Sequence, residues 1–197
     1  MYRFLSCLIL GTFFMGTPCL GANESYFYKA TDSSEIKSTK CKALVEAIVA
    51  YINKHGLEKA IEEINKEDGI FSNLSEHGEQ YAAIYSFDGT VLAHPVFRGM
   101  LGKNALGFKD AFGKNVILED FTIAEHGGGF MKLGYYNPLT KKTEPKKVYI
   151  SPKIITKERP EGIFVGSGFY YTEPHIFPLK TEHLSSYLMD DPKEEAN

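Results

Sequence analysis

Two stretches near the start of the chain carry apolar residues at the spacing of one helix face. The first begins near Ser34 and ends at His55-Gly56, because glycine suits the left-handed position after a helix. Its apolar positions are Cys41, Leu44, Val45, Ile48 and Ile52. The second stretch ends before Gly69, and its apolar positions are Leu57, Ala60, Ile61 and Ile64. The pattern therefore predicts two successive amphipathic helices.

From Tyr81 onward the apolar period changes to that of a strand. Asp88-Gly89 is a strong hairpin signal, and it predicts two strands, at Tyr81–Phe87 and Thr90–His94. A two-residue turn would pair His94 with Ala83, whereas a three-residue loop with a glycine bulge would pair it with Ala82. Both registers place the imidazole opposite an alanine, which leaves space above that point of the sheet.

The remaining pattern predicts one more short helix and three further strands. The helix is expected at Val116–Glu125. The strands are expected at Phe130–Tyr136, Lys146–Ile155 and Ile163–Tyr171, with a polar loop from Asn137 to Pro145. Helices first and antiparallel strands afterwards indicate an α+β fold, with the long N-terminal helices packed on one face of an antiparallel sheet.

The N-terminal residues have the form of a signal peptide over residues 1–22. Arg3 precedes an almost wholly apolar run from Phe4 to Met15, and small residues follow at Gly21-Ala22. We therefore expect a periplasmic or secreted protein, with one domain over residues 23–180 and a charged, disordered tail over 181–197. After cleavage no apolar run long enough to span a membrane is expected, and Cys41 has no partner for a disulfide within the chain.

Charge and composition narrow the classes of function. The chain has 197 residues, of which 43% are hydrophobic and 24% charged, and its formal net charge is −3. This balance lacks the basic footprint of a nucleic-acid-binding protein. The histidines show no metal-ligand spacing, no serine lies in a nucleophile elbow, and Gly127-Gly128-Gly129 lacks the residues of a P-loop. We therefore expect binding without catalysis, and neither a metal nor a cofactor.

One histidine and three strand tyrosines are the first candidates for contacting a ligand. His94 can hydrogen-bond a carboxylate with a charge that depends on pH, or it can be a structural histidine bonded to backbone near the strand end. The tyrosines combine an apolar ring with a polar hydroxyl, which suits a small pocket as well as ordinary core packing. They are Tyr85, Tyr135 and Tyr149.

Three charged residues complete the set of candidates. Arg98 follows the His94-Pro95 corner and can clamp a carboxylate with its guanidinium fork, or lie on the surface. Lys146 can neutralise an anionic ligand, or form an ion pair with Asp110, since a buried charge needs a partner. Asp110 begins a segment of turn composition and can equally be a turn former.

The order of several short motifs resembles that of a known family. The motifs include Gly56-Leu57-Glu58-Lys59-Ala60, Asp88-Gly89-Thr90-Val91-Leu92-Ala93-His94-Pro95, Gly102-Lys103-Asn104, Asn137-Pro138 and Gly166-Ser167-Gly168-Phe169-Tyr170. Over residues 35–171 the chain resembles the single-Cache family of extracytoplasmic sensor domains. The resemblance implies a PAS-like sheet with a pocket for small carboxylates, amino acids or similar metabolites. The chain departs from the family at Tyr135 and Phe164, where Trp is frequent, and at Leu133, where Tyr is frequent.

The resemblance also implies a role in sensing. Members of the family form the outer part of chemoreceptors and sensor kinases, so we expect a free-standing sensor domain that binds a small molecule without changing it. A weak homodimer or a membrane receptor would read the bound state through the exposed side of the helix that begins at Ser34. The alternative is a structural or interaction protein of the envelope, whose pocket is filled by core side chains.

Overall fold

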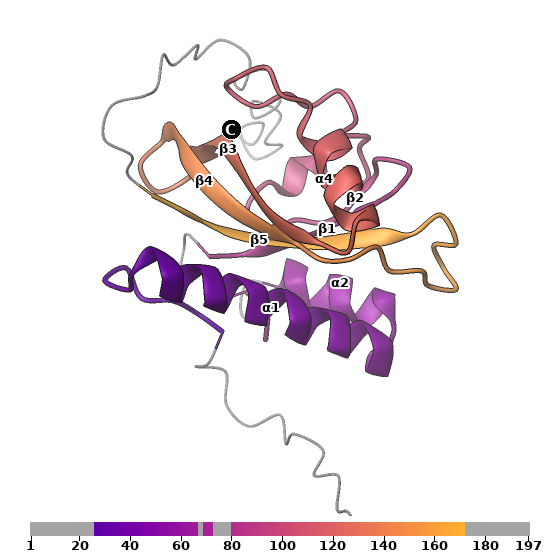
Figure 1. Cartoon of the computed structure of the whole chain (residues 1–197). Helices are drawn as coiled ribbons and strands as arrows, with labels where there is room; N and C mark the ends of the chain where they lie inside the picture. The colour runs from indigo at the N-terminus through magenta and orange to yellow at the C-terminus, as the bar shows by residue number, and fades with distance from the viewer. Residues whose placement is uncertain (1–25, 67–68, 73–79, 172–197) are drawn as a thin grey trace, which may run out of the picture.

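The chain folds around a five-stranded antiparallel sheet with helices on both faces (Figure 1). The computed structural model describes residues 26–66, 69–72 and 80–171. The expected signal peptide, at residues 1–22, and the expected tail, at 181–197, lie outside these described residues. The expected α+β class, with an antiparallel PAS-like sheet, is confirmed.

The middle strand of the sheet is the last in sequence. The strand order is β2-β1-β5-β4-β3, and every neighbouring pair is antiparallel. The strands are β1 (Ala82–Ser86), β2 (Val91–Ala93), β3 (Gly129–Asn137), β4 (Lys142–Ile150) and β5 (Ile163–Tyr170). Every residue of β5 is buried. The N-terminal and C-terminal halves of the sheet are therefore joined through β5.

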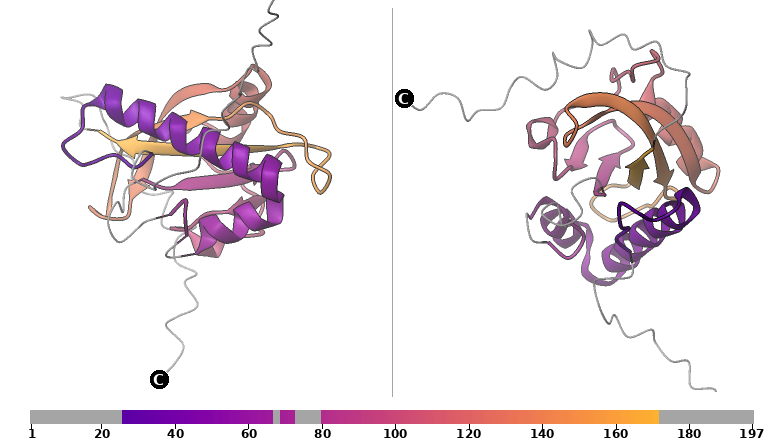
Figure 2. Two further views of the ribbon diagram at one scale, coloured as in Figure 1. Left: turned by 90° about the horizontal axis from the view of Figure 1, so that it is seen from below. Right: turned by 90° about the vertical axis from the view of Figure 1, so that its left-hand side faces the viewer.

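The two long N-terminal helices pack on one face of the sheet, as the sequence predicted (Figure 2). They are α1 (Ser34–His55) and α2 (Leu57–Asn65). Ser33 caps α1 by accepting a hydrogen bond from the N–H of Ile36, and Gly56 separates the two helices with a φ of 90°. The apolar face of α1 packs against Ala82, Ile84 and Val165 of the sheet.

The opposite face of the sheet is covered by a shorter helix and an irregular segment. Helix α4 (Val116–Glu125) has the bounds that the sequence predicted, and the short 3₁₀ helix η1 (Arg98–Met100) precedes it. A second apolar cluster, which includes Val116, Leu133, Ile150 and Phe164, fills the space between α4 and the strands. Alternate residues of each strand thus serve two separate cores.

The hairpin between β3 and β4 differs from the sequence expectation. The segment from Asn137 to Pro145 is not a loop, because β4 already begins at Lys142, which pairs with Asn137. Polar residues suit this part of the strand, since the hairpin tip is largely exposed. The strand also ends at Ile150 rather than Ile155, because Pro152 has no N–H for a sheet ladder.

The β1–β2 hairpin combines both of the registers that the sequence left open. Near the turn Tyr85 pairs with Val91, as in a three-residue loop, and beyond a bulge Ile84 pairs with Ala93, as for a two-residue turn. The second register, continued by one residue, sets His94 opposite Ala83. Strand β2 ends before that pair, at Ala93.

We expect Gly168→Ala to destabilise the domain by about 1–3 kcal/mol, because a Cβ at Gly168 would lie 2.4 Å from the backbone oxygen of Lys147. The control is Gly107→Ala, where a Cβ has no heavy atom within 4 Å. Urea denaturation measures both variants, and equal midpoints for the two would contradict this account of the β4–β5 contact.

Candidate functional site

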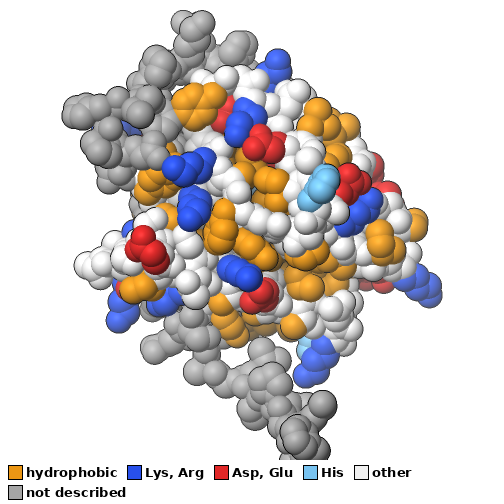
Figure 3. Space-filling view, viewed as in Figure 1, with side chains coloured by type: hydrophobic (Ala, Val, Ile, Leu, Met, Phe, Trp, Pro, Cys, Tyr) orange, Lys and Arg blue, Asp and Glu red, His pale blue; other side chains and the backbone are white. Residues whose placement is uncertain are grey.

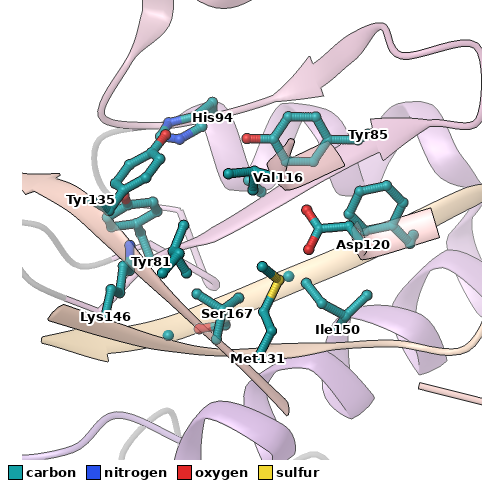
Figure 4. A pocket seen from close by; sticks show the side chains of 16 residues that line it. Tyr81, Tyr85, His94, Val116, Asp120, Met131, Tyr135, Lys146, Ile150 and Ser167 are labelled. Atoms are coloured by element: carbon teal, nitrogen blue, oxygen red, sulfur yellow. The ribbon is translucent and has the colours of Figure 1, made fainter. Parts of the chain in front are cut away.

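A cavity of about 60 Å³ lies on the face of the sheet that α4 covers (Figure 4). Its floor exists because three small residues share this face of the two central strands. Ala83 of β1 pairs directly with Gly166 of β5, and Gly168 follows two residues later. Larger side chains stand around this floor and close it, among them Met131, Leu133, Ile150 and Phe164. The predicted space opposite His94 is therefore real.

One side of the cavity is polar, and its centre is the ammonium group of Lys146. Only 3% of this residue is exposed. Its Nζ lies 3.9 Å from the ring centroid of Tyr81, 4.7 Å from that of Tyr170 and 5.1 Å from that of Tyr135. Aromatic faces attract a cation, so this cage stabilises a charge that burial alone would penalise. We call Lys146, Tyr81, Tyr135 and His94 the polar end of the pocket.

His94 is held at the polar end by its own backbone surroundings. Its N–H donates to Oδ1 of Asn65, and its Nδ1 accepts from the N–H of Phe97. Because Nδ1 accepts, the neutral ring carries its proton on Nε2 and can donate from there. Burial, with the nearby charge of Lys146, lowers the pKa of His94 to about 3. With the protein groups around it, the ring is therefore a neutral donor at neutral pH. The expected dependence of its charge on pH concerned a ring that hydrogen-bonds a ligand carboxylate, and it stays a prediction.

Two of the three predicted tyrosines lie in the cavity wall. Tyr85 stacks on Phe164 with ring centroids 5.3 Å apart, and Tyr135 packs against Phe97 and Phe108. Burial raises the pKa of both phenols above the ordinary value. They therefore remain protonated and can donate or accept one hydrogen bond each.

Sequence reasoning missed several residues that line the cavity, of which Asp120 is the most informative. It comes from α4, is 4% exposed, and turns its carboxyl group into the cavity (Figure 4). Its Oδ1 has no hydrogen-bond partner among the described residues. A signal was present in the sequence, because Asp120 occupies the buried stripe of α4 between Val116 and Ala124. Another missed residue is Tyr81, whose ring lies against both the ammonium group of Lys146 and the ring of His94.

Arg98 does not line the pocket. Its guanidinium donates to the backbone oxygen of Asn65, the last residue of α2. A cation at a helix C-terminus is favourable, because unpaired carbonyl groups face it there. Arg98 is therefore not at the cavity, where the predicted bidentate contact with a ligand carboxylate would need it. Its hydrogen bond to Asn65 links η1 to α2 instead.

Asp110 and Tyr149 also lie outside the pocket. The carboxylate of Asp110 accepts hydrogen bonds from the N–H groups of Phe112, Lys114 and Gly134, so it shapes a turn and joins that turn to β3. The ion pair expected with Lys146 is replaced by these backbone contacts. Tyr149 is on the other face of β4, where it belongs to the core under α1. Tyr149 follows Lys146 by three residues, and because successive side chains of a strand point to opposite faces, the two lie on different faces of β4.

The described residues show neither a metal-binding cluster nor a membrane-spanning helix. No group of three or more His, Cys, Asp or Glu side chains within them is arranged to hold a metal ion. No helix in the same ranges is long and apolar enough to cross a bilayer.

The buried thiol of Cys41 has a pKa raised to about 12, mainly by burial, so it is not a reactive thiolate.

A family model described as a Cache domain matches residues 26–175. The chain belongs to the Cache domain family. Cache domains are extracytoplasmic ligand-sensing modules. The resemblance to a family of sensor domains, which the sequence motifs indicated, is therefore confirmed. No curated protein matches the chain.

Solved structures support the same Cache fold. One is a methyl-accepting chemotaxis protein from Vibrio parahaemolyticus RIMD 2210633, which matches with a TM-score of 0.55 and 19% identity over 69% of this chain and 89% of that one. Another is a Cache chemosensory domain that was solved for its carboxylic acid recognition, with a TM-score of 0.51 and 18% identity over 72% of this chain and 100% of that one. At these identities the likeness shows the fold alone.

We expect His94→Asn to remove a pH dependence of stability. As pH falls below 6.5, the ordinary pKa, unfolded His94 gains a proton that folded His94 does not take up until about pH 3. The wild-type free energy of unfolding should therefore fall by about 1.4 kcal/mol per pH unit in this window, relative to the variant. Denaturant titrations from pH 7 to pH 4 measure the difference. The exposed His126→Asn is the control, and a wild-type slope in the His94 variant would contradict the assignment.

We expect Asp120→Asn to be more stable than the wild type at pH 7 without ligand. Burial raises the pKa of Asp120 well above 3.8, so the unfolded chain releases this proton at a lower pH than the folded one. Wild-type stability is thus lost as pH rises above 3.8, and asparagine has no such loss. Thermal midpoints at pH 4 and pH 7 test this, because the advantage of the variant should grow with pH. The control, Glu125→Gln, alters an exposed acid of the same helix.

Proposed function

We propose that this Cache domain binds a small carboxylate in the cavity and releases it unchanged. The observation that carries the proposal is the buried ammonium group of Lys146 beside an open space. A ligand carboxylate at the polar end would meet this cation together with the Nε2–H of His94 and the hydroxyl of Tyr135. Charge-assisted hydrogen bonds of this kind are the strong ones, at about 1.5–3 kcal/mol each.

The size of the cavity limits the ligand. One water molecule needs roughly 10–15 Å³ when volume is measured in the same way, so 60 Å³ holds roughly four to six non-hydrogen atoms. Acetate, propionate and pyruvate are of this class. The apolar wall formed by Met131, Ile150 and Phe164 suits the carbon chain of such an acid.

The open cavity favours binding over the alternative, a structural protein with a filled pocket. Ala83, Gly166 and Gly168 leave its floor uncovered, although a larger side chain at Ala83 would fill the space and pack the core more fully. Proposed binding without chemistry is supported by the neutral states of His94 and Tyr135, since neither is poised as a base or a nucleophile. Sensor domains among the related structures agree with it.

The proposed setting is periplasmic or secreted, and the apolar run from Phe4 to Met15 supports it. The bound state would be read by a membrane receptor or a weak homodimer through the outer side of α1. That side is charged, with Lys42 paired to Glu46. On the face drawn in Figure 3, basic and acidic side chains are interspersed with apolar ones. Such a surface suits a transient contact rather than an obligate one.

We expect Lys146→Gln to weaken the binding of propionate at least about tenfold, because it removes a charge-assisted contact. Lys147→Gln is the matched control. Lys147 lies on the opposite face of β4, where its Nζ donates to Ser38 and lies over the ring of Phe130. Isothermal titration calorimetry with acetate, propionate and pyruvate measures both variants.

A second variant keeps the test independent of the buried charge. Ala83→Val places two methyl groups in the cavity and leaves every charged group unchanged, so it should abolish binding while the domain stays folded. Unaltered affinity in both Lys146→Gln and Ala83→Val would show that carboxylates bind elsewhere. The absence of binding by all three acids to the wild type would overturn the proposal.

A further inference from the structure

The hairpin formed by β3 and β4 is strongly basic, although the whole chain has a formal net charge of −3. Residues 129–150 contain five lysines and a single acid, Glu144, so the hairpin has a formal net charge of +4. Lys132 and Lys147 lie directly opposite each other on the two strands. Like charges in such a pair are destabilising. The hairpin therefore carries a positive charge that its own residues do not balance.

The face of the hairpin that turns away from the cavity also exposes two aromatic rings. Phe130 is 40% exposed, and Phe112 is 49% exposed. The ring of Phe112 lies over Gly134, because a Cβ at Gly134 would be 3.0 Å from it. Along β3, the exposed Lys132 comes between Phe130 and Gly134 on this face. We call Phe112, Phe130, Lys132 and Lys147 the hairpin patch.

Helix α1 reaches the border of the hairpin patch and leaves its rings exposed. The Nζ of Lys147 donates to the hydroxyl of Ser38 at 3.0 Å and lies 4.6 Å from the ring centroid of Phe130. The acid of α1 that acts on Lys147 is Glu35. One glutamate does not balance a hairpin charge of +4. The patch thus offers apolar rings beside lysines, which suits a segment that is both apolar and acidic.

The chain leaves the described structure beside the hairpin patch. Strand β5 ends next to the hairpin (Figure 1), where the N–H of Tyr171 donates to the backbone oxygen of Pro145. The Nζ of Lys132 lies 5.4 Å from the ring centroid of Tyr171. Whatever follows Tyr171 in the chain therefore starts within reach of the patch.

The segment that follows, residues 172–197, is as acidic as the hairpin is basic. It contains six acids and two lysines, which give a formal net charge of −4, and four of these acids lie in the last eight residues. Before them, Leu184, Tyr187 and Leu188 recur at the spacing of one helix face. The sequence of this segment therefore combines an apolar stripe with an acidic end, which complements the hairpin patch.

We propose that residues 172–197 fold back on the hairpin patch. The apolar stripe packs against Phe112 and Phe130, and the acidic end faces Lys132 and Lys147. Because the segment is tethered at the patch, its effective concentration there is on the order of millimolar, so even weak contacts are enough to hold it. The same two strands carry Leu133 and Lys146 into the cavity on their other face. The segment therefore lies against the back of the cavity wall.

A tryptophan placed in the segment reports whether it docks. The chain contains no tryptophan, so Tyr187→Trp introduces a single one. Its fluorescence emission in the full chain should be shifted to shorter wavelength, relative to a free peptide of residues 172–197 with the same substitution. The reason is that packing against the patch removes the indole ring from water.

Variants of the patch show where the segment lies. Lys132→Glu reverses one charge and Phe130→Ser removes one ring, so each should abolish most of the shift in the tryptophan-containing chain. Asp190→Lys combined with Asp191→Lys should restore the shift in the Lys132→Glu background. The control is Lys59→Glu, which alters an exposed lysine of α2 and should leave the shift unchanged. Circular dichroism of each variant checks that the domain stays folded.

Three results would overturn the inference. An emission maximum equal to that of the free peptide would mean that the segment does not dock. A shift that persists in both Lys132→Glu and Phe130→Ser would place the segment elsewhere on the domain. A shift that appears only as the protein concentration rises, together with dimers in sedimentation, would make a second copy of the chain the occupant of the patch.

Discussion

The site depends on one packing constraint, which is that the central strand of the sheet lacks side chains at two successive positions of the face toward α4. Strand β5 is buried along its whole length, yet Gly166 and Gly168 put no side chain on the face toward α4. At Gly168 this absence is also a steric need, because β4 runs too close for a Cβ. The same glycines therefore allow the two strands to approach closely and leave the floor of a cavity open.

Several groups around that floor are buried at a cost in folding free energy that a purely structural core would avoid. A lysine is buried in a cage of aromatic rings, a histidine is kept neutral, and an acid is buried with an oxygen that has no partner among the described residues. Each of these groups would be more favourably placed in water, or replaced by an apolar side chain. Groups held at such a cost in one cavity are characteristic of binding sites, where stability is given up for function.

The position of the cavity also connects binding to the remainder of the domain. Its floor strand, β5, carries Val165 on its other face, and this side chain packs in the core beneath α1. His94 contacts the end of α2 through Asn65, so the polar end of the pocket is tied to the helical layer as well. A ligand that shifts β5 or His94 by a small amount would therefore act on the helices across the sheet, where the partner contact is proposed.

The sequence by itself determined the secondary structure well, because helical and strand periods are local properties. It indicated α1, α2 and α4, both registers of the first hairpin and the space opposite His94. Two further signals were present in the sequence. Lys146 and Tyr149 are three residues apart in one strand, which places them on opposite faces, and Asp120 interrupts the apolar stripe of a helix. Only the tertiary structure decided the roles of Arg98 and Asp110. Their partners, Asn65 and Gly134, are distant along the chain, and no periodicity reports which backbone groups the fold brings to them.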